Sequence, residues 1–184
     1  MHPTIHAFTV TEYEQFLEDQ SGDASQRYEL IRGVIYEMPP IGVEHASTVT
    51  LLTRFLQLQL GNDYIISVQN PIQLEDNQPQ PDLTIIEWAK WDRAVLPTAD
   101  SISLVIEVSA TTLTYDREVK AYLYAEAGVP EYWIINLPDK VIQHYQEPTQ
   151  EGYAVQRIWK RGETLITPLF PTLALSVTEV LGLL

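Results

Sequence analysis

The chain has 184 residues, enough for one domain with its own core, and its 45% hydrophobic and 20% charged residues are typical of a globular protein. It contains no cysteine, which excludes disulfides, thiolate zinc sites and a cysteine nucleophile. With 11 basic and 25 acidic residues, its formal charge of −14 disfavours tight binding of a polyanion unless a local basic patch forms.

The first part of the chain predicts a helix followed by a hairpin. The run Thr11-Glu12-Tyr13-Glu14 fits the capping-box pattern that opens a helix, which should run to about Asp19. A polar loop around Gly22 should follow. Apolar residues then alternate over 27–38, which predicts a hairpin that turns at Arg32-Gly33.

The rest of the chain alternates between helical and strand periodicity. The run 103–108 is apolar almost throughout, which is typical of a central strand covered on both faces. Helices are expected at 44–60, 115–127 and 176–183, and strands at 64–74, 81–87, 131–137, 140–146, 153–159 and 172–175. This order predicts one α/β domain over 1–184, with a mixed central sheet flanked by helices, an N-terminal hairpin and a C-terminal β-hairpin extension.

Two carboxylates and a lysine stand where these elements can bring them together. Asp82 opens one buried strand, and Glu107 lies near the end of another, where an unpaired acid is costly. Carboxylates on adjacent strands can share Mg²⁺, which prefers oxygen ligands and keeps several waters. The ion would polarise a phosphate and lower the pKa of the attacking water, and Lys120 on the next helix would stabilise the developing charge. The pattern predicts a metal-dependent phosphodiester hydrolase.

Each of these residues also has a structural interpretation. Asp82 alone would be read as a turn cap. Lys120 could instead pair with Asp116, four residues earlier on the same helix. Glu107 could form a structural ion pair with Lys120 or Arg117, without catalysis. Candidate accessory residues, each of which also has a structural interpretation, are Glu29, His45, Ser109 and Tyr124.

Short motifs from about residue 9 to the carboxyl end resemble those of a known family. They are Tyr28-Glu29-Leu30-Ile31-x-Gly33, His45, Pro81-Asp82, Ile106-Glu107-Val108-Ser109, Asp116, Lys120, Tyr124, Gly128-Val129-Pro130-Glu131-Tyr132-Trp133 and Pro171-Thr172-Leu173-x-Leu175. With them the chain resembles the Uma-type family of putative restriction endonucleases, which is placed in the PD-(D/E)xK nuclease superfamily. The resemblance implies a restriction-endonuclease-like core.

The resemblance also implies roles for these residues. Asp82 and Glu107 would bind the metal, Mg²⁺ or alternatively Mn²⁺, with the backbone carbonyl of Val108 as a third ligand. Ser109 stands where the superfamily usually carries a lysine, and Lys120 resembles a migrated substitute. A second departure is Arg32, where the family often has aspartate before the hairpin glycine.

The expected partners are DNA and a second copy of the chain. DNA would bind weakly unless basic residues gather locally, and a homodimer would use the carboxyl helix and the edge strands near 140–159. No segment has the length of a membrane helix, and the amino terminus lacks a signal-peptide pattern, so a cytoplasmic location is expected. The acidic charge and Ser109 leave open an alternative, a catalytically weak or inactive nuclease-fold protein that acts as an interaction module.

Overall fold

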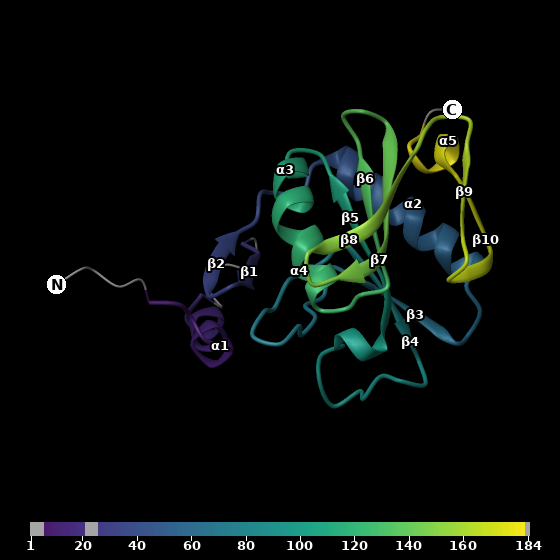
Figure 1. The fold of residues 1–184 in the computed structure, drawn as a ribbon. Coiled ribbons are helices and arrows are strands. Elements are labelled where there is room, and N and C mark those ends of the chain that lie inside the picture. Colours follow the sequence, from purple (N-terminus) through teal and green to yellow (C-terminus); the bar gives the residue numbers. More distant parts are fainter. Residues whose placement is uncertain (1–5, 21–25, 183–184) are drawn as a thin grey trace.

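A six-stranded mixed sheet forms the centre of the protein in the computed structural model, which describes residues 6–20 and 26–182 (Figure 1). In spatial order its strands are β3 (Tyr64–Val68), β4 (Leu83–Glu87), β5 (Ile102–Ser109), β6 (Glu131–Asn136), β7 (Val141–Thr149) and β8 (Gly152–Trp159). The β5–β6 pair is parallel and every other neighbouring pair is antiparallel. The α/β fold with a mixed central sheet is therefore confirmed. The loop around Gly22 lies outside the described residues.

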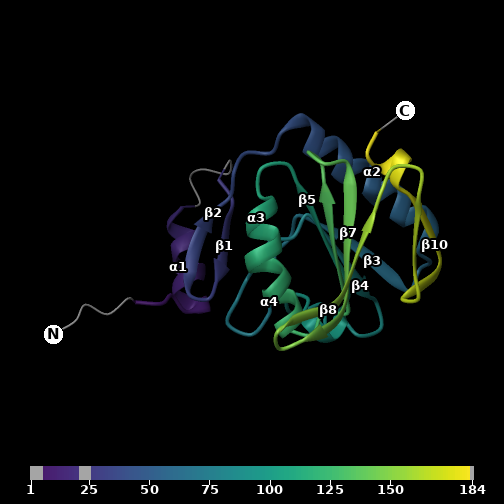
Figure 2. The ribbon, with the colours of Figure 1, turned by 45° about the horizontal axis from the view of Figure 1, so that its top comes forward.

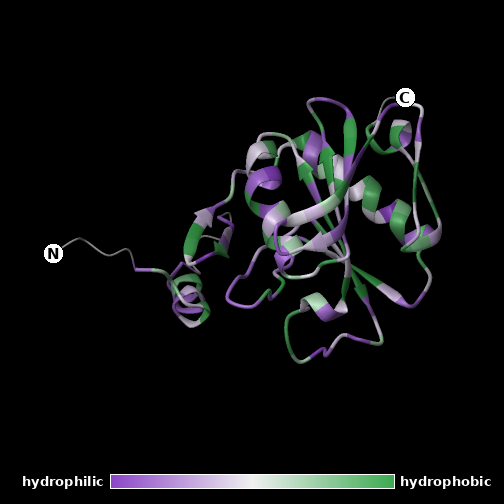
Figure 3. Cartoon of the chain, viewed as in Figure 1, coloured by the Kyte–Doolittle hydropathy of each residue, from purple (hydrophilic) through white to green (hydrophobic). Residues whose placement is uncertain are grey.

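Helices cover both faces of this sheet (Figure 2). On one face lies α2 (Val43–Gln59), which packs its apolar side chains against Leu104, Ile106 and Val108 of β5. On the other lies one continuous helical segment, made of α3 (Leu113–Tyr115), η2 (Asp116–Lys120) and α4 (Ala121–Glu126). The central strands and α2 are largely hydrophobic, whereas the α3–α4 segment carries more hydrophilic residues (Figure 3).

Strand β5 is buried along its whole length, as its nearly continuous apolar run predicts. Successive side chains of a strand point to opposite faces, so Val108 contributes to the α2 side while Glu107 faces the α3–α4 segment. Ser109 points to the same side as Glu107, since its hydroxyl contacts Asp116. The predicted parity of these two residues is confirmed, and it directs a carboxylate into the space under the helix.

The amino-terminal elements form a small unit beside the α3–α4 segment, as Figures 1 and 2 show. They are α1 (Val10–Asp19), β1 (Tyr28–Ile31) and β2 (Val34–Glu37), with the predicted hairpin turn at Arg32 and Gly33. The capping box lies two residues earlier than expected. Thr9, rather than Thr11, accepts from the Glu12 amide, and the Glu12 carboxylate accepts from the backbone N–H of Thr9.

Two other predictions of strand and helix limits need correction. The strand expected at 64–74 ends at Val68, because Gln69 has a left-handed φ of 51° and Pro71 has no N–H for the sheet. The apolar helix expected at 176–183 is the short α5 (Val177–Val180), whose Val177 and Val180 are buried. It does not offer the exposed dimer contact that the sequence predicted.

The carboxyl-terminal hairpin consists of β9 (Thr164–Thr167) and β10 (Phe170–Ser176). The strands expected at 140–146 and 153–159 do form an antiparallel pair, but as β7 and β8 they extend the central sheet. Strand β9 was not predicted. A short 3₁₀ turn, η1 (Ala99–Ser101), leads into β5. Within the described residues, no helix is long and apolar enough to cross a membrane.

Candidate active site

Asp82 and Glu107 lie side by side because β4 and β5 are adjacent antiparallel strands. Leu83 of β4 pairs with Ile106 of β5. In an antiparallel pair this places Asp82, which precedes Leu83, opposite Glu107, which follows Ile106. The backbone N–H of Asp82 lies 3.4 Å from Glu107 Oε2. The N–H of Val108 donates to Asp82 Oδ2 at 2.8 Å. Both acids are buried at one end of the sheet, where Asp82 is 6% exposed and Glu107 is 4% exposed.

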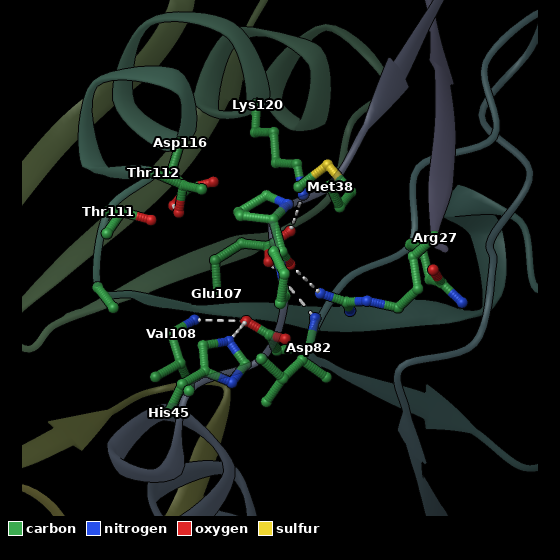
Figure 4. Close-up of a pocket in the computed structure, with 16 residues that line it drawn as sticks. Arg27, Met38, His45, Asp82, Glu107, Val108, Thr111, Thr112, Asp116 and Lys120 are labelled. Atoms are coloured by element: carbon green, nitrogen blue, oxygen red, sulfur yellow. Dashed lines mark hydrogen bonds and ion pairs between the residues drawn. The ribbon is translucent and has the colours of Figure 1, made fainter. Parts of the chain in front are cut away.

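Lys120 completes this pair from the helix above the sheet (Figure 4). Its Nζ donates to Glu107 Oε1 at 2.9 Å and to Glu29 Oε1 at 2.8 Å, and its side chain is 1% exposed. Lys120 lies in a π-helical turn, in which the N–H of Ala121 donates to the carbonyl of Asp116. Such turns occur frequently at functional sites. Lys120 makes ion pairs with Glu29 and Glu107, but it makes none with Asp116.

Glu29 joins the site from β1, although the sequence left its role open. Its side chain is completely buried, and Oε1 accepts both the Lys120 ammonium and the N–H of Gln80 at 2.9 Å. Tyr124 also belongs to the cluster, because its hydroxyl donates to Glu107 Oε1 at 2.9 Å. The ammonium is consequently held between one carboxylate from β1 and one from β5.

His45 and Gln69 hold the carboxylate of Asp82. His45 Nε2 lies 3.0 Å from Oδ2, and Gln69 Nε2 donates to Oδ1 at 3.2 Å. Burial raises the pKa of Asp82, but the hydrogen bond and charge of His45, with the Val108 N–H and Gln69, outweigh it, so the pKa lies below its ordinary value. The Nδ1 atom of His45 is buried and has no hydrogen-bond partner among the described residues.

Ser109 does not replace the missing lysine. Its hydroxyl donates to Asp116 Oδ2, which also accepts from Thr112 Oγ1 at 2.7 Å. Asp116 is a fourth buried acid, which the sequence indicated as a motif residue and as an alternative partner for Lys120, without a role in the site. Arg117 is directed elsewhere, since its Nε donates to Gln143, so it is not the ion-pair partner of Glu107.

Negative charge exceeds positive charge in the buried cluster. Burial is the main cause that raises the pKa of Glu107 well above its usual range, and neighbouring carboxylates add to it while Lys120 opposes it. Burial lowers the pKa of Lys120, but Glu107 and Glu29 outweigh this effect, and the pKa lies well above its ordinary value. Burial also raises the pKa of Asp116. The lysine is thus a permanent cation among four acids.

Five residues of the site line a cleft with a volume of about 50 Å³, namely His45, Asp82, Glu107, Asp116 and Lys120. Arg27 also lines it, and Figure 4 shows its side chain at the right, whereas Lys120 comes from the helix at the top. Among the described residues that line the cleft, Arg27 and Lys120 are the only lysines or arginines. The dispersed basic residues of the chain therefore do not gather here into a patch.

The donor set fits one hard cation. Two adjacent carboxylates face a cleft with room for a few waters, and the excess of buried acids favours an added positive charge. Within the described residues, no three histidine, cysteine or acidic side chains form a ready-made metal cage. Mg²⁺ does not need one, because it binds through one or two carboxylates and keeps several waters. The Val108 carbonyl as a further ligand stays a prediction.

Sequence reasoning missed the residues that arrange this site around its acids. Gln69, Gln80 and Tyr115 contact or surround the cluster, and Tyr115 places its ring 5.6 Å from the Lys120 ammonium; the place of Asp116 in the cluster was not predicted either. For Asp116 a signal existed, since it stands one helical turn before Lys120. Gln69 follows the end of β3 and Gln80 lies in the loop before β4, and neither carries such a pattern.

Comparison with known proteins adds a family and a similar fold. A family model described as "Putative restriction endonuclease" matches residues 10–178. The crystal structure of a protein from Anabaena variabilis, described as a putative nuclease, superposes with a TM-score of 0.69 at 15% sequence identity, and the match covers 95% of this chain and 98% of that one. No match was found among curated proteins.

Proposed function

The chain belongs to the Uma2 family of putative restriction endonucleases, and we propose that it hydrolyses DNA phosphodiester bonds with a divalent metal held by Asp82 and Glu107. The observation that supports this most directly is the pairing of these two acids at the end of adjacent strands, with the Lys120 ammonium 2.9 Å from Glu107. Mg²⁺ is the proposed ion, with Mn²⁺ as an alternative, because both accept oxygen ligands.

Each residue of the cluster has a distinct role in this proposal. A bound divalent ion would polarise the phosphate and lower the pKa of a water. Lys120 remains an ammonium because its carboxylate partners raise its pKa, so it acts as an electrostatic group rather than a general base. Glu29 and Tyr124 fix the positions of Lys120 and Glu107, respectively.

Two further residues prepare the cleft for the substrate. His45 orients Asp82 through its hydrogen bond to Oδ2, which keeps this carboxylate ionised and in one position. Arg27 lines the same cleft and provides a guanidinium that can pair with a phosphate oxygen. Because few cations line the cleft, we expect weak binding of DNA with a shallow salt dependence, since the slope scales with the number of phosphates that are neutralised.

The decisive experiment is a cleavage assay on supercoiled plasmid in Mg²⁺, in Mn²⁺ and in EDTA. We expect nicked or linear products only with a divalent ion, and on the order of 100-fold slower cleavage for Asp82→Asn, Glu107→Gln and Lys120→Met. Lys90→Met is the matched control, because it removes an exposed lysine that pairs with Glu87. Metal-independent cleavage, or equal rates in Lys120→Met and Lys90→Met, would refute the proposal.

A specific observation favours the alternative of an interaction protein without turnover. Every buried charge of the site already has a partner inside the protein: Lys120 holds Glu107, while His45, Gln69 and the Val108 N–H hold Asp82. Calorimetric titration with Mg²⁺ separates the two functions. Binding that is lost in Glu107→Gln supports the nuclease, whereas a folded protein that binds neither Mg²⁺ nor Mn²⁺ supports the alternative.

We also propose that the active protein is a homodimer, which would let each subunit cut one strand of a duplex. Strand β8 is one of the two edge strands of the central sheet, and an edge strand offers unpaired backbone groups to a second copy. Sedimentation equilibrium over a range of concentrations tests this assembly. A mass of 21.0 kDa at every concentration would contradict it.

A further inference from the structure

A second concave region lies between the helical segment and the β7–β8 pair, where Figure 1 shows β8 passing across α4. Its volume is about 510 Å³, within the range of small-molecule sites. We call it the tyrosine groove, and its lining residues include Arg117, Tyr122, Gln143, Tyr145, Tyr153 and Ile158. It shares no lining residue with the active-site cleft, so the groove is a separate feature.

Arg117 is the only cation among the described residues that line the groove. It is exposed, and its Nε donates to Gln143 Oε1 at 2.8 Å. Burial raises the pKa of Tyr145, and the nearby Arg117 guanidinium opposes this shift. The charge of Arg117 therefore lies close to Tyr145. The contact through Nε holds the guanidinium beside Gln143, where its charge can pair with an anion that enters the groove.

Gln143 forms the floor of the groove and holds an unsatisfied donor. Its Oε1 accepts from Arg117 and, at 3.0 Å, from the Tyr145 hydroxyl, so two donors fix the orientation of the amide. Its Nε2 is buried and has no partner within the described part of the chain. Buried amide groups are nearly always hydrogen-bonded, so this donor is available for an acceptor that the protein itself does not supply.

The walls of the tyrosine groove consist of exposed aromatic and apolar side chains. Tyr122 is 50% exposed, and Ile158 is 48% exposed. The Tyr122 ring lies against Gly152, where an added Cβ would stand 3.3 Å from the ring and where φ is +117°. Glycine therefore allows the ring to rest on the β7–β8 turn. Such a ring presents a stacking surface for a planar group.

We propose that the tyrosine groove binds a nucleotide unit, with its phosphate on Arg117 and its base against Tyr122. In this arrangement a base carbonyl accepts from Gln143 Nε2, while the guanidinium keeps its Nε contact with Gln143 Oε1. Tyrosine, amide and guanidinium together match the ring, carbonyl and anion of this ligand class. The site does not depend on the proposed hydrolysis, because the groove and the cleft share no lining residue.

The test is calorimetric titration of the full chain in EDTA, which keeps the metal site out of the measurement. The probes are the four 5′-deoxynucleoside monophosphates, the corresponding nucleosides and the dinucleotide pTpT. We expect at least one monophosphate to bind, and Arg117→Gln to weaken that binding on the order of tenfold while the nucleoside is unaffected. Tyr122→Ala should weaken both ligands.

Arg157→Gln is the matched control, because Arg157 stacks on Trp159, 3.5 Å from its ring centroid, and does not line the groove. Binding of a monophosphate assigns the groove to a free nucleotide, and binding of pTpT alone assigns it to a nucleic-acid end. Both support the ligand class. The absence of binding by every probe at millimolar concentration overturns the proposal, as does an equal loss in Arg117→Gln and Arg157→Gln.

Discussion

Replacement of Lys120 by methionine tests the core of the site most sharply. Methionine keeps most of the aliphatic length and removes the ammonium, which leaves Glu29 and Glu107 buried without their shared cation. Breaking a buried ion pair from one side costs about 3–5 kcal/mol. We expect the lower end, about 3 kcal/mol, because the pKa of Glu107 is already raised and this carboxyl can take up a proton.

The assay is urea unfolding followed by circular dichroism and tryptophan fluorescence, with coincident transitions as the test of two-state behaviour. In the variant, buried carboxyls with raised pKa bind more protons when folded than when unfolded. Stability therefore falls as pH rises, and the difference from wild type should shrink at low pH. Lys90→Met should cost at most about 1 kcal/mol, as exposed pairs do. A Lys120→Met cost that matches this control and does not vary with pH would refute the reasoning.

Three other perturbations test the surrounding fold. Thr9→Ala removes the α1 capping box and should cost about 1 kcal/mol, seen as faster amide exchange in the first turn, whereas unchanged exchange would contradict it. Gly33→Ala should cost roughly 1–3 kcal/mol in urea unfolding, because φ is +73° and the new Cβ would lie 2.5 Å from that of Ala7. Burial raises the pKa of Glu131, but His144 and other donors outweigh it and hold the pKa below its ordinary 4.5. Wild type should therefore lose this contribution as pH falls below 4.5, and Glu131→Gln should show a flatter profile there; parallel profiles would contradict it.

The central strand and its acid could be predicted because both signals are local. A run of apolar residues interrupted only by Glu107 indicates a buried strand, and period-two geometry then decides which face carries the carboxylate. Asp82 follows from the same reasoning, since it immediately precedes a second buried strand. The adjacency of the two strands needed the fold, and the family resemblance supplied it.

The remaining parts of the site depend on contacts that leave no local pattern. Glu29 meets Lys120 across 91 positions of sequence, and nothing in a hairpin arm shows that it will be buried. The π-helical turn at 116–120 has an ordinary helical sequence. Strand β9 lies between turns and has too few alternating residues to stand out, so only its pairing with β10 defines it.

The ion pair between Glu29 and Lys120 also limits when the site can form during synthesis of the chain. Strand β1 leaves the ribosome early, but its carboxylate has no cation to meet until the helix 91 positions later has emerged and packed on the sheet. Closing so long a loop is slow compared with forming local hairpins. The acidic cluster therefore cannot assemble before residue 120 has been synthesised, and a nascent chain that stops before residue 120 carries the acids without their lysine.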